Sequence, residues 1–90
     1  MAKKVAVLVR DRQAEALRMA VGLTLADDAI DVYVLDRKVE ETDDNALNLE
    51  TMKDMDVKAF SNSRENADME FVPTEEIAGR LLGYDIVLSY

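Results

Sequence analysis

The residues best placed to do chemistry are polar side chains that directly follow a short apolar run. The stretch "AFSNSREN", residues 59–66, leads from a strand-like pattern into two serines and an asparagine. Ser61 or Ser63 would need a base within hydrogen-bond reach to act as a nucleophile, and without histidine only a carboxylate or lysine remains. Both serines, with Asn62, can instead turn the chain by bonding its backbone. We expect no catalysis at either serine.

The composition removes several classes of site. The 90-residue chain contains no cysteine and no histidine, which excludes disulfides, thiol nucleophiles, persulfides, and Cys/His zinc sites. The residues directly after the first apolar run, "RDRQAE", contain no glycine, so the sequence has neither a dinucleotide-binding loop nor a P-loop there. A phospho-receiver needs an acidic pair, an aspartate and a lysine at three strand ends. These positions hold Asp11 alone, Phe60–Ser61 and Ser89–Tyr90. We predict no cofactor.

The charge balance narrows the range of partners. The formal net charge is −8, whereas binding to nucleic acid or to an anionic membrane surface needs a surplus of lysine and arginine. The apolar run at residues 5–9 is too short for a signal-peptide core, and no run approaches the roughly 20 residues of a membrane span. We expect a soluble cytoplasmic protein that binds neither nucleic acid nor membranes.

These polar residues must be positioned by alternating strands and helices. Valine-rich runs predict strands at residues 3–9, 29–36, 56–60, 69–72 and 84–90. Helical spacing predicts helices at residues 11–28, 45–55 and 75–82. This alternation favours a single α/β domain over residues 1–90, built as a three-layer α/β/α sandwich on a mostly parallel sheet of four to five strands.

The helix faces and ends also follow from residue types. We expect the caps at Asp11, at Thr42, Asp43 or Asp44, and at Thr74. We expect the inward positions to be Ala14, Leu17, Ala20, Val21, Thr24, Leu25, Leu47, Met52 and Met55. Gly22 is expected to let the first helix approach the sheet, and Gly83 to end the third helix in a left-handed conformation.

One edge of the sheet gathers the basic residues. In open parallel sheets, ligands bind outside the carboxyl ends of the strands. Five of the eleven basic residues follow those ends, and they are Arg10, Arg12, Arg37, Lys38 and Arg64. Two interpretations remain open. The arginines either hold a phosphate, sulfate or carboxylate, or form surface pairs with Asp11, Asp36 and Glu65.

Two groups of acids permit further interpretations. Residues 40–56 carry seven acids against Lys53 alone, which is typical of a solvated helix face and would also suit docking of a basic partner. Asp11 and Asp36 follow different strands and would form a carboxylate pair or weak Mg²⁺ site if they meet. The latter arrangement would make the protein a carboxylate- or metal-dependent enzyme acting on a small molecule.

Taken in order, the segments resemble the DsrE/DsrF-like family of sulfur-relay proteins over nearly the whole chain. The resemblance rests on "EALRMAVGLTLAD", "IDVYVLD", "DMDVKAFSNSREN" and "MEFVPTEEIAGRLLGYDIVLSY". In sulfur-carrying members the third of these contains Cys-Gly-Asn-Ser, and the cysteine bears a persulfide. Phe60 stands at that cysteine and Ser61 at the glycine, whereas Asn62 and Ser63 match their counterparts.

The resemblance implies a flavodoxin-like fold and an assembly into trimers or hexamers, or with related DsrE-like subunits. It does not imply sulfur transfer, because no thiol is present anywhere in the chain. We therefore expect a non-catalytic, oligomeric protein that binds a partner or a small anion. The expected binding residues are Arg10, Arg12, Arg37, Phe60, Ser61, Asn62 and Arg64.

Overall fold

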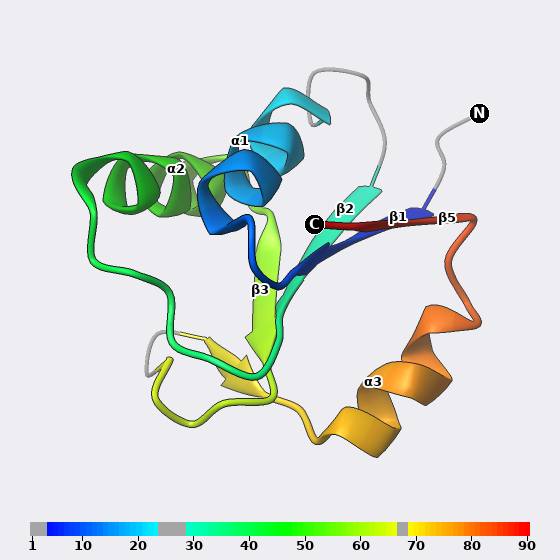
Figure 1. Cartoon of the computed structure of the whole chain (residues 1–90). Helices are drawn as coiled ribbons and strands as arrows, with labels where there is room; N and C mark the ends of the chain where they lie inside the picture. Colours follow the sequence, from blue (N-terminus) through cyan, green and yellow to red (C-terminus); the bar gives the residue numbers. More distant parts are fainter. Residues whose placement is uncertain (1–3, 24–28, 67–68) are drawn as a thin grey trace.

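Strands and helices alternate along the chain as expected (Figure 1). The computed structural model describes residues 4–23, 29–66 and 69–90. The elements are β1 (Lys4–Val9), α1 (Gln13–Leu23), β2 (Ala29–Val34), α2 (Asp43–Asp54), β3 (Lys58–Ser61), β4 (Glu70–Phe71), α3 (Thr74–Leu81) and β5 (Ile86–Ser89). Lys3, Thr24 and Leu25, which we assigned to elements, lie outside the described residues.

The five strands form one sheet in the order β4-β3-β2-β1-β5, and every pair is parallel. The expected three-layer α/β/α architecture is confirmed, because α1 and α2 lie on one face and α3 lies on the other (Figure 1). Right-handed crossovers explain this division. The chain steps in one direction across the sheet from β1 to β4. It then returns from β4 to β5 at the other edge, which places α3 on the opposite face.

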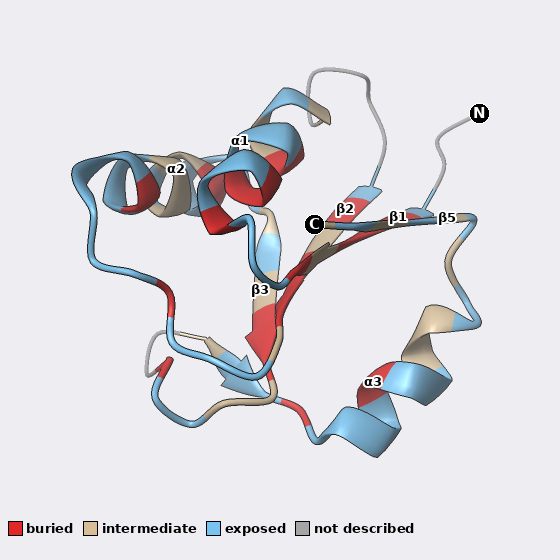
Figure 2. Ribbon diagram, viewed as in Figure 1, coloured by how far each residue is buried: buried red, intermediate tan, exposed pale blue. Residues whose placement is uncertain are grey.

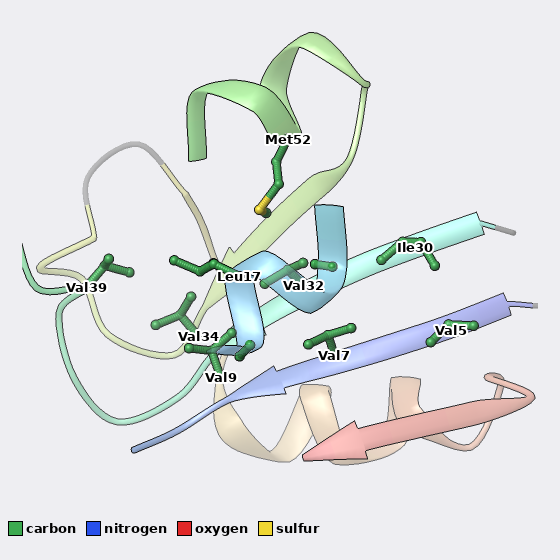
Figure 3. Packing of buried hydrophobic residues seen from close by; sticks show 11 residues of the cluster. Val5, Val7, Val9, Leu17, Ile30, Val32, Val34, Val39 and Met52 are labelled. Atoms are coloured by element: carbon green, nitrogen blue, oxygen red, sulfur yellow. The ribbon is translucent and has the colours of Figure 1, made fainter. Parts of the chain in front are cut away.

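Alternating strand residues build two cores on opposite faces of the sheet. The larger core lies under α1 and α2, where Leu17 and Met52 meet the valines of β1 and β2 (Figure 3). The smaller core lies under α3 and contains Ala6, Tyr33, Phe60, Val72 and Ile77. Because β1 and β2 are buried on both faces, their sequences read as nearly continuous apolar runs.

The expected inner faces of α1 and α2 are only partly correct. Leu17, Ala20 and Met52 are buried, but Ala14 is exposed. The buried stripe of α1 starts with a polar residue and consists of Gln13, Ala16, Leu17 and Ala20. The buried residues of α2 are Asn45 and Met52. In each helix the first buried residue is an amide, Gln13 in α1 and Asn45 in α2. The buried stripe of each helix therefore differs from the one that the apolar residues alone predict.

The outer face of α2 carries apolar residues that we expected inside. Leu47 is 62% exposed and Met55 is 38% exposed. Gly22 gives no close approach to the sheet either, since a Cβ added there meets nothing within 4 Å. The stripe from Asn45 to Met52 faces the sheet, so Leu47 necessarily points elsewhere.

Of the expected helix ends, the structure confirms the cap at Thr42. The predictions for Asp11, Thr74 and Gly83 are wrong. Thr42 caps α2, because its side chain accepts from the Asn45 N–H at 3.1 Å. Asp11 lies outside the first turn of α1, where Ala16 N–H bonds the Arg12 carbonyl. Thr74 is the first residue of α3, and Pro73 precedes it without a side-chain cap bond. No described glycine has a positive φ, so Gly83 is not left-handed.

A left-handed residue ends α2 at Asp56, whereas Gly83, where we expected one after α3, is not left-handed. The φ of Asp56 is 60°, and the N–H groups of Asp56 and Val57 bond the carbonyls of Lys53 and Met52 beyond the last turn of α2. This pattern is a Schellman motif, whose left-handed position favours glycine. A side chain with a Cβ is disfavoured there, although aspartate tolerates it better than most residues.

We predict that Asp56→Gly stabilises the protein by about 0.5–1 kcal/mol, because glycine adopts this conformation without a steric penalty. Urea unfolding measures the difference. Asp54→Gly is the control, since Asp54 lies inside α2 and glycine there lowers stability. A loss of stability in both variants would show that the left-handed position is not strained.

Candidate functional site

The polar residues at the carboxyl edge of the sheet surround the connection between β2 and α2, residues 35–42. This connection lacks regular structure, so its backbone N–H and C=O groups need partners other than a helix or a strand. Side-chain amides supply six of these partners, and the four amide residues come from α1, from α2 and from the loop after β3. They are Gln13, Asn45, Asn62 and Asn66.

Asn66 makes the most interior of these contacts and is itself buried. Its Oδ1 accepts from the Val39 N–H at 2.9 Å. Its Nδ2 donates to the Arg37 carbonyl at 3.1 Å and to the Ser61 Oγ at 2.8 Å. The side chain therefore ties the loop after β3 to the connection after β2, and it holds Val39 against the larger core.

Gln13 and Asn45 fix the connection from the helix side. Gln13 Nε2 donates to the Lys38 carbonyl at 3.1 Å, and its Oε1 accepts from the Glu40 N–H at 2.8 Å. Asn45 Nδ2 donates to the Glu40 carbonyl at 3.0 Å. The Oδ1 of Asn45 is buried and has no hydrogen-bond partner among the described residues. Together these two amides position the chain for its entry into α2.

Ser61 is enclosed within this network. It has no exposed surface, and its Oγ donates to the Val34 carbonyl at 2.9 Å. The same oxygen accepts from Asn66 Nδ2 and from the Ser63 N–H at 3.0 Å. A hydroxyl so occupied has no proton to give to a base and no path to a substrate. The side chain serves the backbone, in line with the structural interpretation of its sequence.

Asn62 and Asp36 bind each other at the same edge. The Asp36 N–H donates to Asn62 Oδ1 at 2.6 Å, and Asn62 Nδ2 donates to Asp36 Oδ1 and to Thr74 Oγ, both at 3.0 Å. Asp36 has a φ of 68°, in the left-handed region that aspartate tolerates. Asn62 thus links the turn after β2 to the start of α3, and Thr74 is bound by it instead of capping the helix.

Asp11 and Asp36, which would form a carboxylate pair if they met, contact different residues. Asp11 Oδ1 forms an ion pair with Arg37 at 3.2 Å, whereas Asp36 is bound by Asn62. Across residues 4–23, 29–66 and 69–90, no group of three or more acidic side chains is placed to hold a metal ion.

The arginines of this edge are exposed and face separate neighbours. Arg12 pairs with Glu15 at 3.4 Å and Arg37 pairs with Asp11. The guanidinium of Arg64 lies 4.3 Å from the centre of the Phe71 ring. Arg10 is exposed, and no ion pair of its side chain is found in the part of the chain that the structure describes. The arrangement corresponds mainly to surface pairs, which contribute little to stability.

Phe60 lies away from these arginines, on the α3 face of the sheet. Its ring stacks on Tyr33 with the centroids 5.1 Å apart, and the guanidinium of Arg80 lies 5.2 Å from the ring centre. Residues of β3 alternate between the two faces, so Phe60 and Ser61 point in opposite directions. Of the expected binding residues, the structure brings together Ser61 and Asn62 and separates Phe60 from them.

A second polar cluster, on the α3 face, consists of Asp31, Tyr33, Tyr84 and Arg80. The Tyr84 hydroxyl donates a short hydrogen bond to Asp31 Oδ2 and lies 2.8 Å from the Tyr33 hydroxyl, which must then donate to it. Burial, followed by the hydrogen bond to Asp31, raises the pKa of Tyr84 well above its usual range. Hydrogen bonding to Tyr33 raises the pKa of Arg80.

Sequence reasoning missed most of these residues for a common reason. Gln13, Asn45 and Asn66 look like surface polar residues in a pattern that marks only apolar positions as buried. The hydroxyl groups of Tyr33 and Tyr84 have partners in distant segments, which a local sequence pattern does not reveal. Asp31 interrupts the apolar run of residues 29–35, and this charge inside a strand pattern was an available signal.

Comparison of the chain with known protein families, with characterised proteins and with solved structures finds no match in any of the three. No helix among the described residues is long and apolar enough to cross a membrane.

We predict that Asn66→Ala lowers the free energy of unfolding by about 2–3 kcal/mol, because it leaves the buried Val39 N–H without an acceptor. Urea unfolding measures this loss. Ser63→Ala is the control, since the Ser63 Oγ accepts one long contact of 3.4 Å, and it should change stability by less than about 0.5 kcal/mol. Equal effects of the two substitutions would contradict a structural role for the Asn66 amide.

We predict that Tyr84 makes the protein lose stability in alkaline solution. Its pKa in the folded protein lies above the value of roughly 10 in the unfolded chain, so the unfolded state loses the proton first. This contribution is complete below about pH 10 and declines as the pH rises further. Tyr84→Phe should therefore reduce the loss of stability between pH 8 and 11, as measured by urea unfolding.

Tyr90→Phe serves as the control for this substitution, because no hydrogen bond of the Tyr90 hydroxyl is found among the described residues. Stability curves of wild type and Tyr84→Phe that fall in parallel with pH would contradict the assignment.

Proposed function

We propose that this protein is a non-catalytic, DsrE-like interaction subunit that assembles with copies of itself or with related chains and carries no sulfur. It would act in the cytoplasm as a partner in a complex. The proposal joins the resemblance of the sequence to what the end of β3 can and cannot do chemically.

The closed end of β3 carries the proposal. The residue that matches the persulfide cysteine, Phe60, is 9% exposed and packed against Tyr33. The next residue, Ser61, has every hydroxyl contact taken by Val34, Ser63 and Asn66. The Oγ of Ser63, the other serine at this strand end, accepts from the Glu65 N–H at 3.4 Å, and no contact with a base is found for it among the described residues. The frame of the site is kept by hydrogen bonds, and its chemistry is absent.

The α3 face supports assembly. One helix of 8 residues covers this side of a five-stranded sheet, and Ile77 is its one buried residue (Figure 2). Leu82, just after the helix, is 90% exposed, and Val87 of β5 is 43% exposed on the same face. Val87 belongs to this face because its partner in the ladder, Ala6, lies in the smaller core. A second subunit would cover these apolar side chains.

Small-anion binding at the arginine edge has weaker support than assembly. Arg12 and Arg37 each face a carboxylate, so only Arg10 among these three brings charge without a nearby acid among the described residues. A lone exposed arginine is a weak anion site. The carboxylate- or metal-dependent enzyme has less support again, because Asp11 and Asp36 are bound to different partners.

We predict a solution mass of three or six times the 10.1 kDa chain, measured by light scattering. Leu82→Glu should shift the mass toward the monomer, because it places a charge on the exposed apolar face. Leu47→Glu is the matched control, since Leu47 is also exposed but lies on α2, and it should leave the mass unchanged.

Mixing with cysteine-bearing DsrE-like proteins of the same organism extends this experiment. A mixed complex supports a role as a partner subunit. A monomer that also ignores those proteins would contradict the proposed function.

A further inference from the structure

An open groove runs along α2 on the face of the sheet opposite α3. It consists of two adjoining cavities of about 420 Å³ each, which share Ala46, Leu49 and Met69 as lining residues. One cavity extends toward the start of α2 at Asp43, and the other toward its end at Lys53. We call this feature the α2 groove.

The floor of the α2 groove is apolar and continuous with the larger core. Leu49, Met69, Val57 and Ala59 are half-buried and pack against that core, and Met52 is fully buried beneath them. Leu49 belongs to α2 and Ala59 to β3, whereas Val57 directly precedes β3 and Met69 directly precedes β4. Apolar side chains from several elements therefore converge on a surface that no described segment of the chain covers completely.

The architecture explains why this surface is open. Parallel strands are usually joined by a crossover helix, which would lie beside α2 and cover β3 and β4. The connection from β3 to β4 has no helix within its described part, residues 62–66 and Met69. The layer formed by α1 and α2 therefore stops at α2. The α2 groove lies where the next helix of that layer would pack.

The rim of the α2 groove is acidic. Five carboxylates line it against two lysines, and these residues are Glu40, Glu41, Asp43, Glu50, Glu65, Lys38 and Lys53. Lys38 is already paired with Glu41 at 2.9 Å. The remaining rim favours a positively charged occupant. Another copy of this chain is a poor match, because its net charge is −8.

We propose that the α2 groove binds an amphipathic helix of a partner protein, with an apolar stripe flanked by lysine or arginine. Ten residues of α2 separate Asp43 from Lys53, so the groove is about 15 Å long and accepts roughly three helical turns. A helix fits better than a strand, because the edge strand β4 has only two residues to offer for pairing. This inference deepens the proposed binding role and rests on it.

A labelled synthetic peptide of about 14 residues tests the proposal, with leucines at helical spacing and lysines elsewhere. Fluorescence anisotropy should show it binding at least about tenfold more tightly than a scrambled peptide of the same composition. A version with glutamate in place of lysine should not bind. Scrambled and ordered peptides that bind equally would overturn the proposal, because charge alone would then explain the binding.

Paired protein variants locate the peptide. Glu40→Lys combined with Glu50→Lys reverses two rim charges and should weaken binding about tenfold or more. Glu15→Lys combined with Glu75→Lys makes the same change in net charge outside the groove, and should weaken binding less than about twofold. Equal losses in the two double variants would overturn the site.

The floor is tested by Leu49→Lys against Leu47→Lys, two neighbours on α2 of which only Leu49 lines the groove. Leu49→Lys should abolish binding, and Leu47→Lys should preserve it. Circular dichroism establishes that both variants are folded. If Leu49→Lys loses its fold, the exposed rim variants decide the outcome alone.

Repeating the titration on Leu82→Glu separates this inference from the proposed assembly. Peptide binding that persists in the Leu82→Glu monomer supports the groove independently of assembly. An oligomer that binds no peptide overturns the groove and leaves assembly standing. A wild-type oligomer that falls apart on Leu49→Lys would assign the groove to a second copy, and so overturn the partner helix.

Discussion

The rest of the structure depends on the hydrogen bonds between side-chain amides and the connection from β2 to α2. That segment leaves the sheet without regular structure, and a buried backbone group without a partner costs about 1–3 kcal/mol. Four side-chain amides from α1, from α2 and from the loop after β3 bind its backbone groups instead. They are Gln13, Asn45, Asn62 and Asn66. Because the connection is fixed, Val39 stays in the larger core and Thr42 stands where it can cap α2.

This constraint also decides what the carboxyl edge of the sheet can do. In open parallel sheets this edge is where ligands bind, and here its polar side chains bind the backbone and one another. Ser61 and Asn62 were expected to bind a ligand, but their polar atoms hold the turn together. Two apolar surfaces of the described structure stay partly uncovered, and they are the thinly covered α3 face and the α2 groove. Both arise because the helical layers do not fully cover the sheet.

Much of the fold was predictable from the sequence, and the failures have identifiable causes. Runs of valine predicted β1 and β2, and Thr42 was one of three residues expected to cap α2. The orientation of α1 and α2 was misjudged because buried amides at Gln13 and Asn45 resemble surface residues. Gly83 does not end α3 in a left-handed conformation, whereas Asp56 has that conformation after α2, because backbone conformation follows the chain path and not residue preference alone. Strand order depends on contacts between distant segments and is absent from any local pattern.

The most direct measurement of this account is amide hydrogen exchange in the connection after β2, resolved by residue. The N–H groups of Asp36, Val39 and Glu40 donate to side-chain oxygens of Asn62, Asn66 and Gln13. The account predicts that these three amides exchange as slowly as those of β1 and β2, although they lie in a connection without regular structure. Exchange at the rate of an open loop, with β1 still protected, would contradict it. The amides and Ser61 would then be free to meet a ligand.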